Sequence, residues 1–183
     1  MKIKRLDPGD ARPYFTCGDN DLDEFYSRDS ILSANQLLSV SYGVLDETES
    51  LVAYFSVSND AISRDHMPNS RFHRLFNTIP LEKRYSTLPA VKIGRLGVSE
   101  RAQCNKLGTN ILDFLKVWFT HKNKTGCRFI VVDAYNNPRT INFYEKNGFK
   151  FLVDGNKNDS TRIMYFDLIP FINFVIESQS IKK

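Results

Sequence analysis

The sequence predicts a single α/β (α+β) domain with a central mixed, twisted β-sheet and helices on both of its faces. Strand-like and helical segments alternate along the whole chain, which is typical of such a layered fold. The 183 residues, 42% of them apolar, suffice for one sizeable core but leave little room for a second. We therefore expect one domain over residues 1–183, with a basic insertion at 64–90 and a C-terminal tail at 168–183.

The first elements are a short strand and a capped helix. Residues 3–6 form the strand candidate, and the turn-forming residues 7–10 follow it. Within "FTCGDNDLDEFYSRDSILSANQ", either Asp19 or Asn20 can cap a helix. The acidic residues directly after the cap suit the positive end of the helix dipole, so we expect the helix to start there.

Strands and helices then alternate to the end of the chain. Residues 37–46 and 50–62 are rich in β-branched and aromatic residues and predict an antiparallel hairpin; residues 90–98 predict a strand covered on both faces. Apolar residues at helical spacing after Gly108 predict a long amphipathic helix. A buried strand (127–135), a short helix closing at Gly148 and a last strand (162–168) follow. The apolar tail is expected to pack on the parent domain, the alternative being a partner surface.

Charge and cysteine content narrow the function classes. Five of the basic residues lie in segment 64–90 against two acidic ones, which accounts for three of the four net positive charges. This segment is either a solvated insertion or a surface for a phosphate-bearing substrate. The three cysteines suggest neither a disulfide framework nor a metal site, and no stretch of ~18 apolar residues exists. We expect a cytoplasmic protein without a bound metal or a membrane segment. The basic residues are Arg64, Arg71, Arg74, Lys83 and Arg84.

The stretch "VSERAQCNKLGTNIL" (98–112) joins a strand to a helix through a polar turn. A helix that begins near Lys106 presents free backbone N–H groups at its positive end, and such an end binds anions. Gly108 allows close approach of the backbone, and polar side chains add further donors. A pyrophosphate suits this turn, although any polar strand–turn–helix segment resembles it.

The stretch "YNNPRTINFYEKNGF" (135–149) follows a buried strand. Asn137, Thr140, Tyr144 and Gly148 are spaced by three, four and four residues, so Thr140 and Tyr144 share one helix face. The tyrosine is either a proton donor or a residue of the core or its rim.

Together the two stretches resemble the GNAT superfamily of acetyl-CoA-dependent N-acetyltransferases. Gln103, Lys106 and Gly108 fall on its pyrophosphate motif, Gln/Arg-x-x-Gly-x-Gly/Ala, with lysine where glycine is usual. Asn137, Thr140, Tyr144 and Gly148-Phe149 fall on its later motif, with Thr140 replacing alanine. If position 106 needs φ > 0, the lysine costs ~1 kcal/mol or more. Its ammonium can offset this cost by pairing with a phosphate. The alternative is a weakened cofactor site.

The resemblance implies a fold, a cofactor and a reaction. Backbone N–H groups near Gly97 and Val98 would hold the thioester carbonyl, and Tyr144 would protonate the departing thiolate. The base is left open between Glu100, Asp133 and a water chain. The residues expected to bind acetyl-CoA are Leu96, Gly97, Val98, Gln103, Cys104, Asn105, Lys106, Leu107, Gly108, Thr109, Asn137, Thr140 and Phe143.

Residues up to about 150 also resemble the acetyltransferase toxins of bacterial toxin–antitoxin pairs. The likeness rests on Phe15, Cys17, Gly18, Leu22, Asp23 and Phe25 and on residues 93–98. It implies acetylation of the α-amine of aminoacyl-tRNA and a ribbon-helix-helix antitoxin as partner, and a homodimer is also considered. The basic residues of segment 64–90 would hold the acceptor's phosphates; Arg95 is either a substrate contact or an ion-pair residue. The rival functions are an acetyltransferase of small-molecule or protein amines and a non-catalytic acyl-CoA-binding module.

Overall fold

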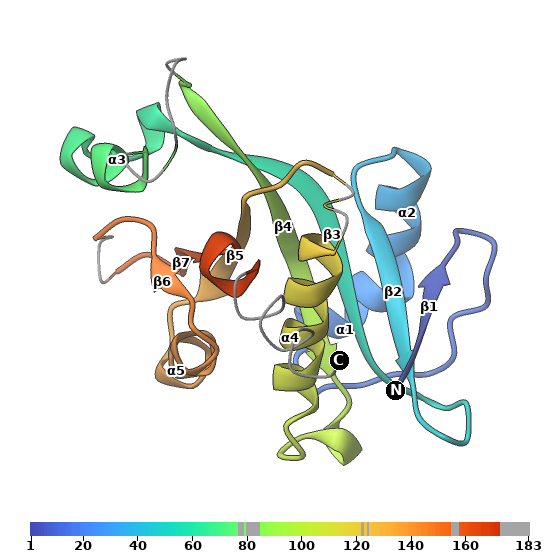
Figure 1. The fold of residues 1–183 in the computed structure, drawn as a ribbon. Helices are drawn as coiled ribbons and strands as arrows, with labels where there is room; N and C mark the ends of the chain where they lie inside the picture. Colours follow the sequence, from blue (N-terminus) through green and yellow to red (C-terminus); the bar gives the residue numbers. More distant parts are fainter. Residues whose placement is uncertain (77–78, 80–84, 122, 124, 155–157, 173–183) are drawn as a thin grey trace, which may run out of the picture. The chain divides into compact units, whose positions relative to one another are not determined.

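A computed structural model describes residues 1–76, 79, 85–121, 123, 125–154 and 158–172 of the chain. Its strands are β1 (Lys2–Leu6), β2 (Val40–Leu45), β3 (Leu51–Ser63), β4 (Thr87–Val98), β5 (Phe129–Tyr135), β6 (Lys150–Phe151) and β7 (Thr161–Asp167). They form a sheet in the order β1-β2-β3-β4-β5-β7-β6 (Figure 1). The fold divides into two compact units, Met1–Ser58 with Ile93–Phe114, and Asn59–Lys92 with Leu115–Lys183. Strands β3 and β4 run through both units.

The first unit contains the predicted hairpin. Strand β2 pairs antiparallel with β1, from Lys2↔Leu45 to Leu6↔Ser41, and with β3, from Val40↔Val57 to Leu45↔Leu51. The turn between β2 and β3 is closed by the Asp46 carboxylate, which accepts hydrogen bonds from the backbone N–H groups of Thr48 and Ser50. The hairpin prediction is therefore confirmed.

The predicted N-terminal helix is present, with an unforeseen turn in its middle. It consists of α1 (Asn20–Glu24), a π-helical turn η1 (Phe25–Asp29) and α2 (Ser30–Asn35). Of the two expected candidates, Asp19 is the N-cap, because its side chain accepts a hydrogen bond from Leu22 N at 3.2 Å. A π turn re-aims the side chains of a helix and is common at functional sites. Nothing in the apolar spacing signals it.

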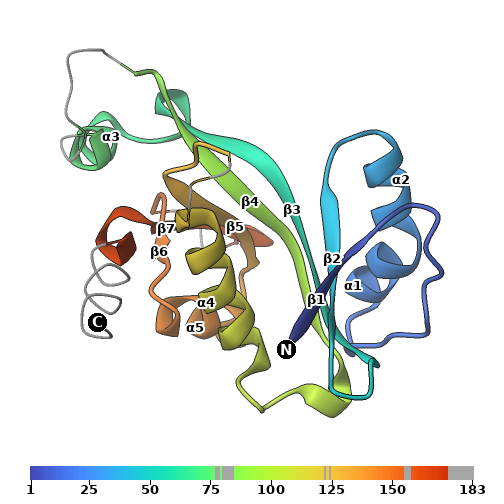
Figure 2. The ribbon, with the colours of Figure 1, turned by 45° about the vertical axis from the view of Figure 1, so that its right-hand side comes forward.

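Aromatic rings fill the space between this helix and the strands of the first unit. Phe15, Tyr26 and Tyr54 are buried with Leu6, and the three ring centroids lie 5.2 to 5.4 Å apart. Such aromatic pairs stabilise a core by about 0.5–1.5 kcal/mol beyond their buried area. Within this unit, α1 and α2 lie on one face of the strands and the first half of α4 (Leu107–Thr120) on the other (Figure 2).

The second unit makes the sheet mixed. Strand β5 pairs antiparallel with β7, from Phe129↔Asp167 to Tyr135↔Thr161, and β6 pairs antiparallel with β7. Arg128 N, just before β5, donates to Pro89 O of β4. Further toward the C-terminal end of each strand, Lys92 of β4 forms an ion pair with Asp133 of β5. Because both contacts advance in the same direction, β4 and β5 run parallel. The predicted mixed sheet is confirmed, and β6 is an addition that two residues are too few to signal.

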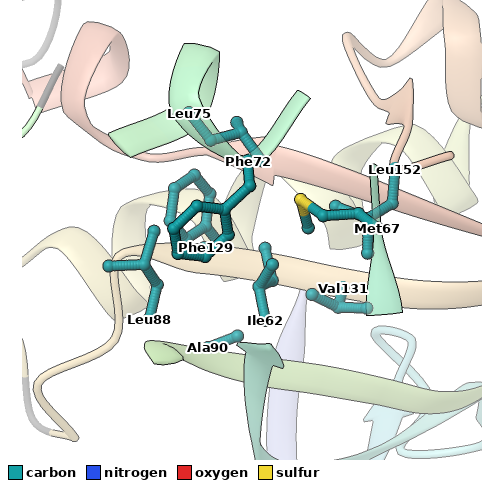
Figure 3. Close-up of a cluster of buried hydrophobic side chains, with 9 residues drawn as sticks. All are labelled: Ile62, Met67, Phe72, Leu75, Leu88, Ala90, Phe129, Val131 and Leu152. Atoms are coloured by element: carbon teal, nitrogen blue, oxygen red, sulfur yellow. The ribbon is translucent and has the colours of Figure 1, made fainter. Parts of the chain in front are cut away.

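The basic segment contributes a helix to the core of the second unit. After the 3-10 turn η2 (Arg64–His66), helix α3 (Asn69–Phe76) inserts Phe72 and Leu75 into a buried cluster (Figure 3). The other members of this cluster are Ile62, Met67, Leu88, Ala90, Phe129, Val131 and Leu152. The segment was expected as a basic insertion, and its apolar residues anchor the helix in this cluster.

Helix α5 (Pro138–Lys146) completes the second unit. Of the tail, Leu168 is buried, whereas residues 173–183 lie outside the described residues, so the packing expected for them stays a prediction. The single-domain organisation also stays a prediction. None of the described helices is long and apolar enough to cross a membrane.

Candidate functional site

The penultimate residue of strand β4, Gly97, lies against an aromatic ring. A Cβ built on Gly97 would lie 2.6 Å from Tyr54 Cε1, which is closer than real Cβ atoms come, and 3.4 Å from Phe15 Cε1. The position therefore needs glycine because the Tyr54 ring fills the space. Tyr54 is fully buried, and its hydroxyl donates to Leu22 O at 2.6 Å. The ring thus connects α1 with the end of β4.

The turn after β4 is fixed by its own hydrogen bonds. Ser99 N donates to Val52 O, and the N–H groups of Ala102 and Gln103 fold back to Ser99 O. The Gln103 side chain donates through Nε2 to Cys17 O at 2.8 Å and to Val98 O at 3.0 Å. Gln103 therefore ties the turn to a distant segment, a use that the motif alone does not predict.

The next residues adopt strained backbone conformations. Cys104 and Lys106 have φ values of 63° and 58°, in the left-handed region that favours glycine. Position 106 therefore does require the positive φ that makes lysine costly. Turns that combine right- and left-handed residues can form concavities of backbone N–H groups that bind anions.

The helix after the turn adds further donors. The first helical hydrogen bond of α4 runs from Asn110 N to Lys106 O at 2.9 Å. The N–H groups of Leu107, Gly108 and Thr109 precede it and have no acceptor within the helix. They lie at the positive end of a 14-residue helix, beside the exposed Lys106. This donor set fits a pyrophosphate, and the structure brings all the predicted cofactor residues from Leu96 to Thr109 into one stretch of the first unit.

The other predicted cofactor residues lie on α5 in the second unit. Asn137 caps this helix, since its Oδ1 accepts from Thr140 N at 2.9 Å, and Pro138 occupies the first helical position. Gly148, with φ of 83°, ends the helix in the left-handed conformation. Much of this motif therefore serves to start and stop a helix. Thr140 and Phe143 are half-buried on it.

Tyr144 is held in the interior of the second unit. Its ring packs edge-on against Phe143 and Phe149, with centroids 5.1 and 5.3 Å away. Burial raises the pKa of the Tyr144 hydroxyl well above its ordinary value. The side chain therefore keeps its proton at neutral pH, as a proton donor must.

Arg95 forms an ion pair, one of the two roles left open for it, whereas its contact with a substrate stays a prediction. Its Nε lies 3.4 Å from Asp21 Oδ2, and its guanidinium lies 5.1 Å from the centre of the Phe25 ring. Nε is inaccessible to water and has no hydrogen-bond partner among the described residues, because the Asp21 contact is too poorly aligned. Arg95 thus forms an ion pair, and its Nε–H lacks a hydrogen-bond acceptor among the described residues.

The basic segment is only partly described. Arg64 donates twice to Asn69 Oδ1 and lies over the Phe72 ring, and Arg74 is exposed on α3 opposite the buried Phe72. The Arg71 side chain and all of Lys83 and Arg84 lie outside the described residues.

The structure adds contacts but does not select a base. Asp133 is ion-paired with Lys92, whereas Glu100 packs against Gly18. Sequence reasoning missed Thr16, Asp23 and Tyr54 as residues of this region. Asp23 belongs to the N-terminal motif that the toxins share, and its occurrence there was the one available signal. Among the described residues, no group of three or more His, Cys, Asp or Glu side chains could hold a metal ion.

The turn after β4, with its free backbone N–H groups, and the separate helix α5, which buries a protonated tyrosine, are each typical of enzymes that use acylated, phosphate-bearing cofactors. The sequence matches the Acetyltransferase (GNAT) family over residues 11–149, so the chain belongs to this family. The predicted enzyme class, acetyltransferase, and the predicted cofactor, acetyl-CoA, are thereby confirmed. No curated protein sequence matches the chain.

Solved structures of bacterial toxins share the fold over nearly the whole chain. AtaT complexed with acetyl-methionyl-tRNAfMet is 20% identical, with a TM-score of 0.74 over 96% of this chain and 98% of that one. A mutant of KacT is 21% identical, with a TM-score of 0.73 over 95% and 98% of the two chains. An AtaT mutant bound to the C-terminus of the antitoxin AtaR is 17% identical, with a TM-score of 0.68 and 96% coverage of each chain.

Proposed function

We propose that this acetyltransferase acts on the α-amine of aminoacyl-tRNA and is the toxin of a toxin–antitoxin pair. The observation that carries the proposal is the match, from end to end, to a toxin solved with an acetylated aminoacyl-tRNA. The N-terminal motif of these toxins supports it, because its residues Cys17, Leu22 and Asp23 hold the cofactor turn and the end of β4 in this chain.

Acetyl-CoA supplies the acetyl group as an activated thioester. The N–H groups of Leu107, Gly108 and Thr109, together with the Lys106 ammonium, would bind its pyrophosphate. The backbone N–H groups near Gly97 and Val98 would hold the thioester carbonyl, where negative charge develops during attack by the amine.

Tyr144 would donate the proton to the departing thiolate. Its raised pKa keeps the hydroxyl protonated, and positioned acids contribute about 10²- to 10⁴-fold to rates. A tyrosine more basic than a thiolate donates only with help from its surroundings, so the transfer must be coupled to departure of the thiolate.

The chemistry of the acceptor also favours an α-amine. An α-amine with a pKa of about 7.7 is roughly one-sixth neutral at pH 7, whereas a lysine with a pKa of about 10.4 is almost wholly protonated. An α-amine acceptor can therefore react with a weaker base, and the candidates for that base are Glu100, Asp133 and a water chain. Arg64 and Arg74, with Arg71, Lys83 and Arg84, would hold acceptor phosphates, and Arg95 would add a donor near α1.

The proposal extends to partners and location. A ribbon-helix-helix antitoxin would neutralise the enzyme, in keeping with the AtaT structure that contains AtaR. A homodimer and a cytoplasmic location, where tRNA is charged, belong to the same proposal.

The test is transfer of labelled acetyl from acetyl-CoA to bulk aminoacylated tRNA. Uncharged tRNA and the Tyr144→Phe variant are run in parallel. We expect acetylated aminoacyl ends only with charged tRNA, and a steep loss of the signal as salt is raised. Transfer to small amines or peptides, but not to aminoacyl-tRNA, would establish the rival acetyltransferase. Binding of acetyl-CoA without transfer to any of these acceptors would leave the non-catalytic module.

A further inference from the structure

Asp23 binds a short segment that precedes its own helix. Its Oδ2 accepts from the Thr16 hydroxyl at 2.8 Å, and its Oδ1 accepts from Cys17 N at 2.9 Å. Gly18 N in turn donates to Thr16 Oγ1 at 3.3 Å. The segment 16–18 is therefore curled around one carboxylate.

Both oxygens of the Asp23 carboxylate accept hydrogen bonds from this segment, and these bonds affect its pKa. Burial alone raises the pKa of Asp23, but the hydrogen bonds from Cys17 and Thr16 outweigh it, and the pKa lies below its ordinary value. Asp23 is thus ionised at neutral pH. Its charge stabilises the conformation of segment 16–18 in which the Thr16 hydroxyl and Cys17 N donate to it.

The other side of segment 16–18 binds the cofactor turn. Thr16 O accepts from Glu100 N at 3.1 Å, and Cys17 O accepts from Gln103 Nε2 at 2.8 Å. Gly18, with φ of 80°, lies against the Glu100 side chain, and a Cβ built there would approach Glu100 Oε1 to 3.0 Å. Segment 16–18 therefore joins α1 to the turn that follows β4.

The anchored residues adjoin the strained ones. Gln103 directly precedes Cys104, and Lys106 leads into α4, so the two left-handed residues lie between a hydrogen-bonded anchor and a helix. Backbone in such conformations persists only where neighbouring contacts hold it. If the anchor is loosened, the turn is free to relax, and the N–H groups at the start of α4 lose the backbone that positions them.

From these contacts we infer that Asp23 is a positioning residue for acetyl-CoA: through segment 16–18 it holds the cofactor turn in its binding conformation. The inference rests on the proposed binding of pyrophosphate at this turn and not on the identity of the acceptor. The same contacts couple the position of α1 to the conformation of the cofactor turn. Displacement of α1 by a ligand or partner would therefore change the affinity for acetyl-CoA.

The test is the dissociation constant of acetyl-CoA for the full chain, measured by calorimetry without an acceptor and well below the melting temperature. In Asp23→Ala both acceptors are lost, and we expect the Kd to rise by about three- to tenfold, because only a fraction of the molecules keeps the competent turn. Asp23→Asn retains one acceptor and should fall between wild type and Asp23→Ala. Thr16→Val removes the hydroxyl that donates to Asp23 and accepts from Gly18 N, and it should also raise the Kd. This variant keeps the inference testable if the alanine variant fails to fold.

The matched control is Asp19→Asn. This substitution removes the same charge from the start of the same helix, and asparagine caps a helix as well as aspartate does. The Asp19 side chain accepts from Leu22 N of the helix and not from segment 16–18. The inference is overturned if all Asp23 and Thr16 variants bind acetyl-CoA as tightly as Asp19→Asn, even where their melting temperatures fall. Failure of the wild type to acetylate aminoacyl-tRNA would refute the proposed acceptor without affecting this result.

Discussion

The turns in the two sequence motifs use left-handed backbone in opposite ways. At the end of α5, Gly148 adopts a φ of 83°, which costs glycine nothing sterically. In the cofactor turn, Cys104 and Lys106 adopt 63° and 58° with side chains attached. Each non-glycine residue there costs roughly 1–2 kcal/mol. The α5 motif is therefore relaxed, and the cofactor turn is strained.

The difference separates a motif that builds structure from one that builds a site. Asn137 and Gly148 start and stop a helix and so place Tyr144, for which an unstrained backbone is sufficient. The cofactor turn has to point several N–H groups at one anion, and its strain is held by contacts through Gln103. We therefore expect substitutions in the α5 motif to affect chemistry or stability. Substitutions in the cofactor turn should affect stability and the affinity for acetyl-CoA.

The largest effect is expected at the residue that the relaxed motif places. Tyr144→Phe keeps the ring packing and removes the proton donor, so kcat should fall by about 10²- to 10⁴-fold with little change in the Kd of acetyl-CoA. The pKa of Tyr144 is raised, so the protonated form persists to higher pH. Any loss of wild-type activity from its ionisation should therefore appear only above about pH 10 in a kcat–pH profile. A kcat within threefold of wild type would remove the tyrosine from the chemistry.

The next effect is on stability, at the glycine itself. Gly148→Ala should cost about 1–2 kcal/mol, because alanine resists the left-handed region and its Cβ would lie 3.0 Å from Phe166 Cε2. The melting temperature should fall by about 2–8 °C. Gly126→Ala is the matched control, since Gly126 has φ of 68° but no atom near its Cβ position. An equal loss in the two variants would show that the Phe166 contact contributes nothing.

In the strained turn, the same logic predicts a gain in stability. Lys106→Gly should stabilise the free protein by about 1 kcal/mol, as glycine accepts the left-handed conformation. It should also weaken acetyl-CoA binding severalfold, because the ammonium no longer pairs with a phosphate.

Lys106→Ala separates the two effects, since it keeps the strain and loses the charge. Calorimetry at two salt concentrations measures the charge, and thermal melts measure the strain. If Lys106→Gly binds acetyl-CoA more tightly than wild type, lysine at this position weakens the cofactor site instead of compensating for its own strain.

The smallest effect is expected at Cys104. Glycine usually lowers stability relative to alanine, but here the order should reverse, with Cys104→Gly more stable than Cys104→Ala by up to about 1 kcal/mol. Chemical denaturation of the two variants measures the difference. The usual order would contradict the left-handed conformation of this residue.

Much of the fold could be predicted from local patterns. Asp19 or Asn20 was expected to start the first helix because its oxygen can accept a free N–H group there, and Asp19 does so. The hairpin followed from two β-rich stretches and an acidic turn. The π turn at Phe25–Asp29 and strand β6 could not be predicted, because the first depends on how the helix packs and the second has only two residues.

The candidate site divides in the same way. The spacing of Gln103, Lys106 and Gly108 located the cofactor turn. It also indicated that position 106 could require a positive φ, and Lys106 has a φ of 58°. The role of the Gln103 side chain was not foreseen, because its acceptor Cys17 lies 86 positions away in the sequence.

By itself, the sequence determined most of the segments that form strands and helices, the family and the cofactor, because propensity, capping and motif spacing act over a few residues. Only the tertiary structure decided that Gly97 must admit the Tyr54 ring and that Asp23 and segment 16–18 hold the cofactor turn. Those contacts join residues far apart in the chain, and their geometry is set by packing and burial that no local pattern encodes.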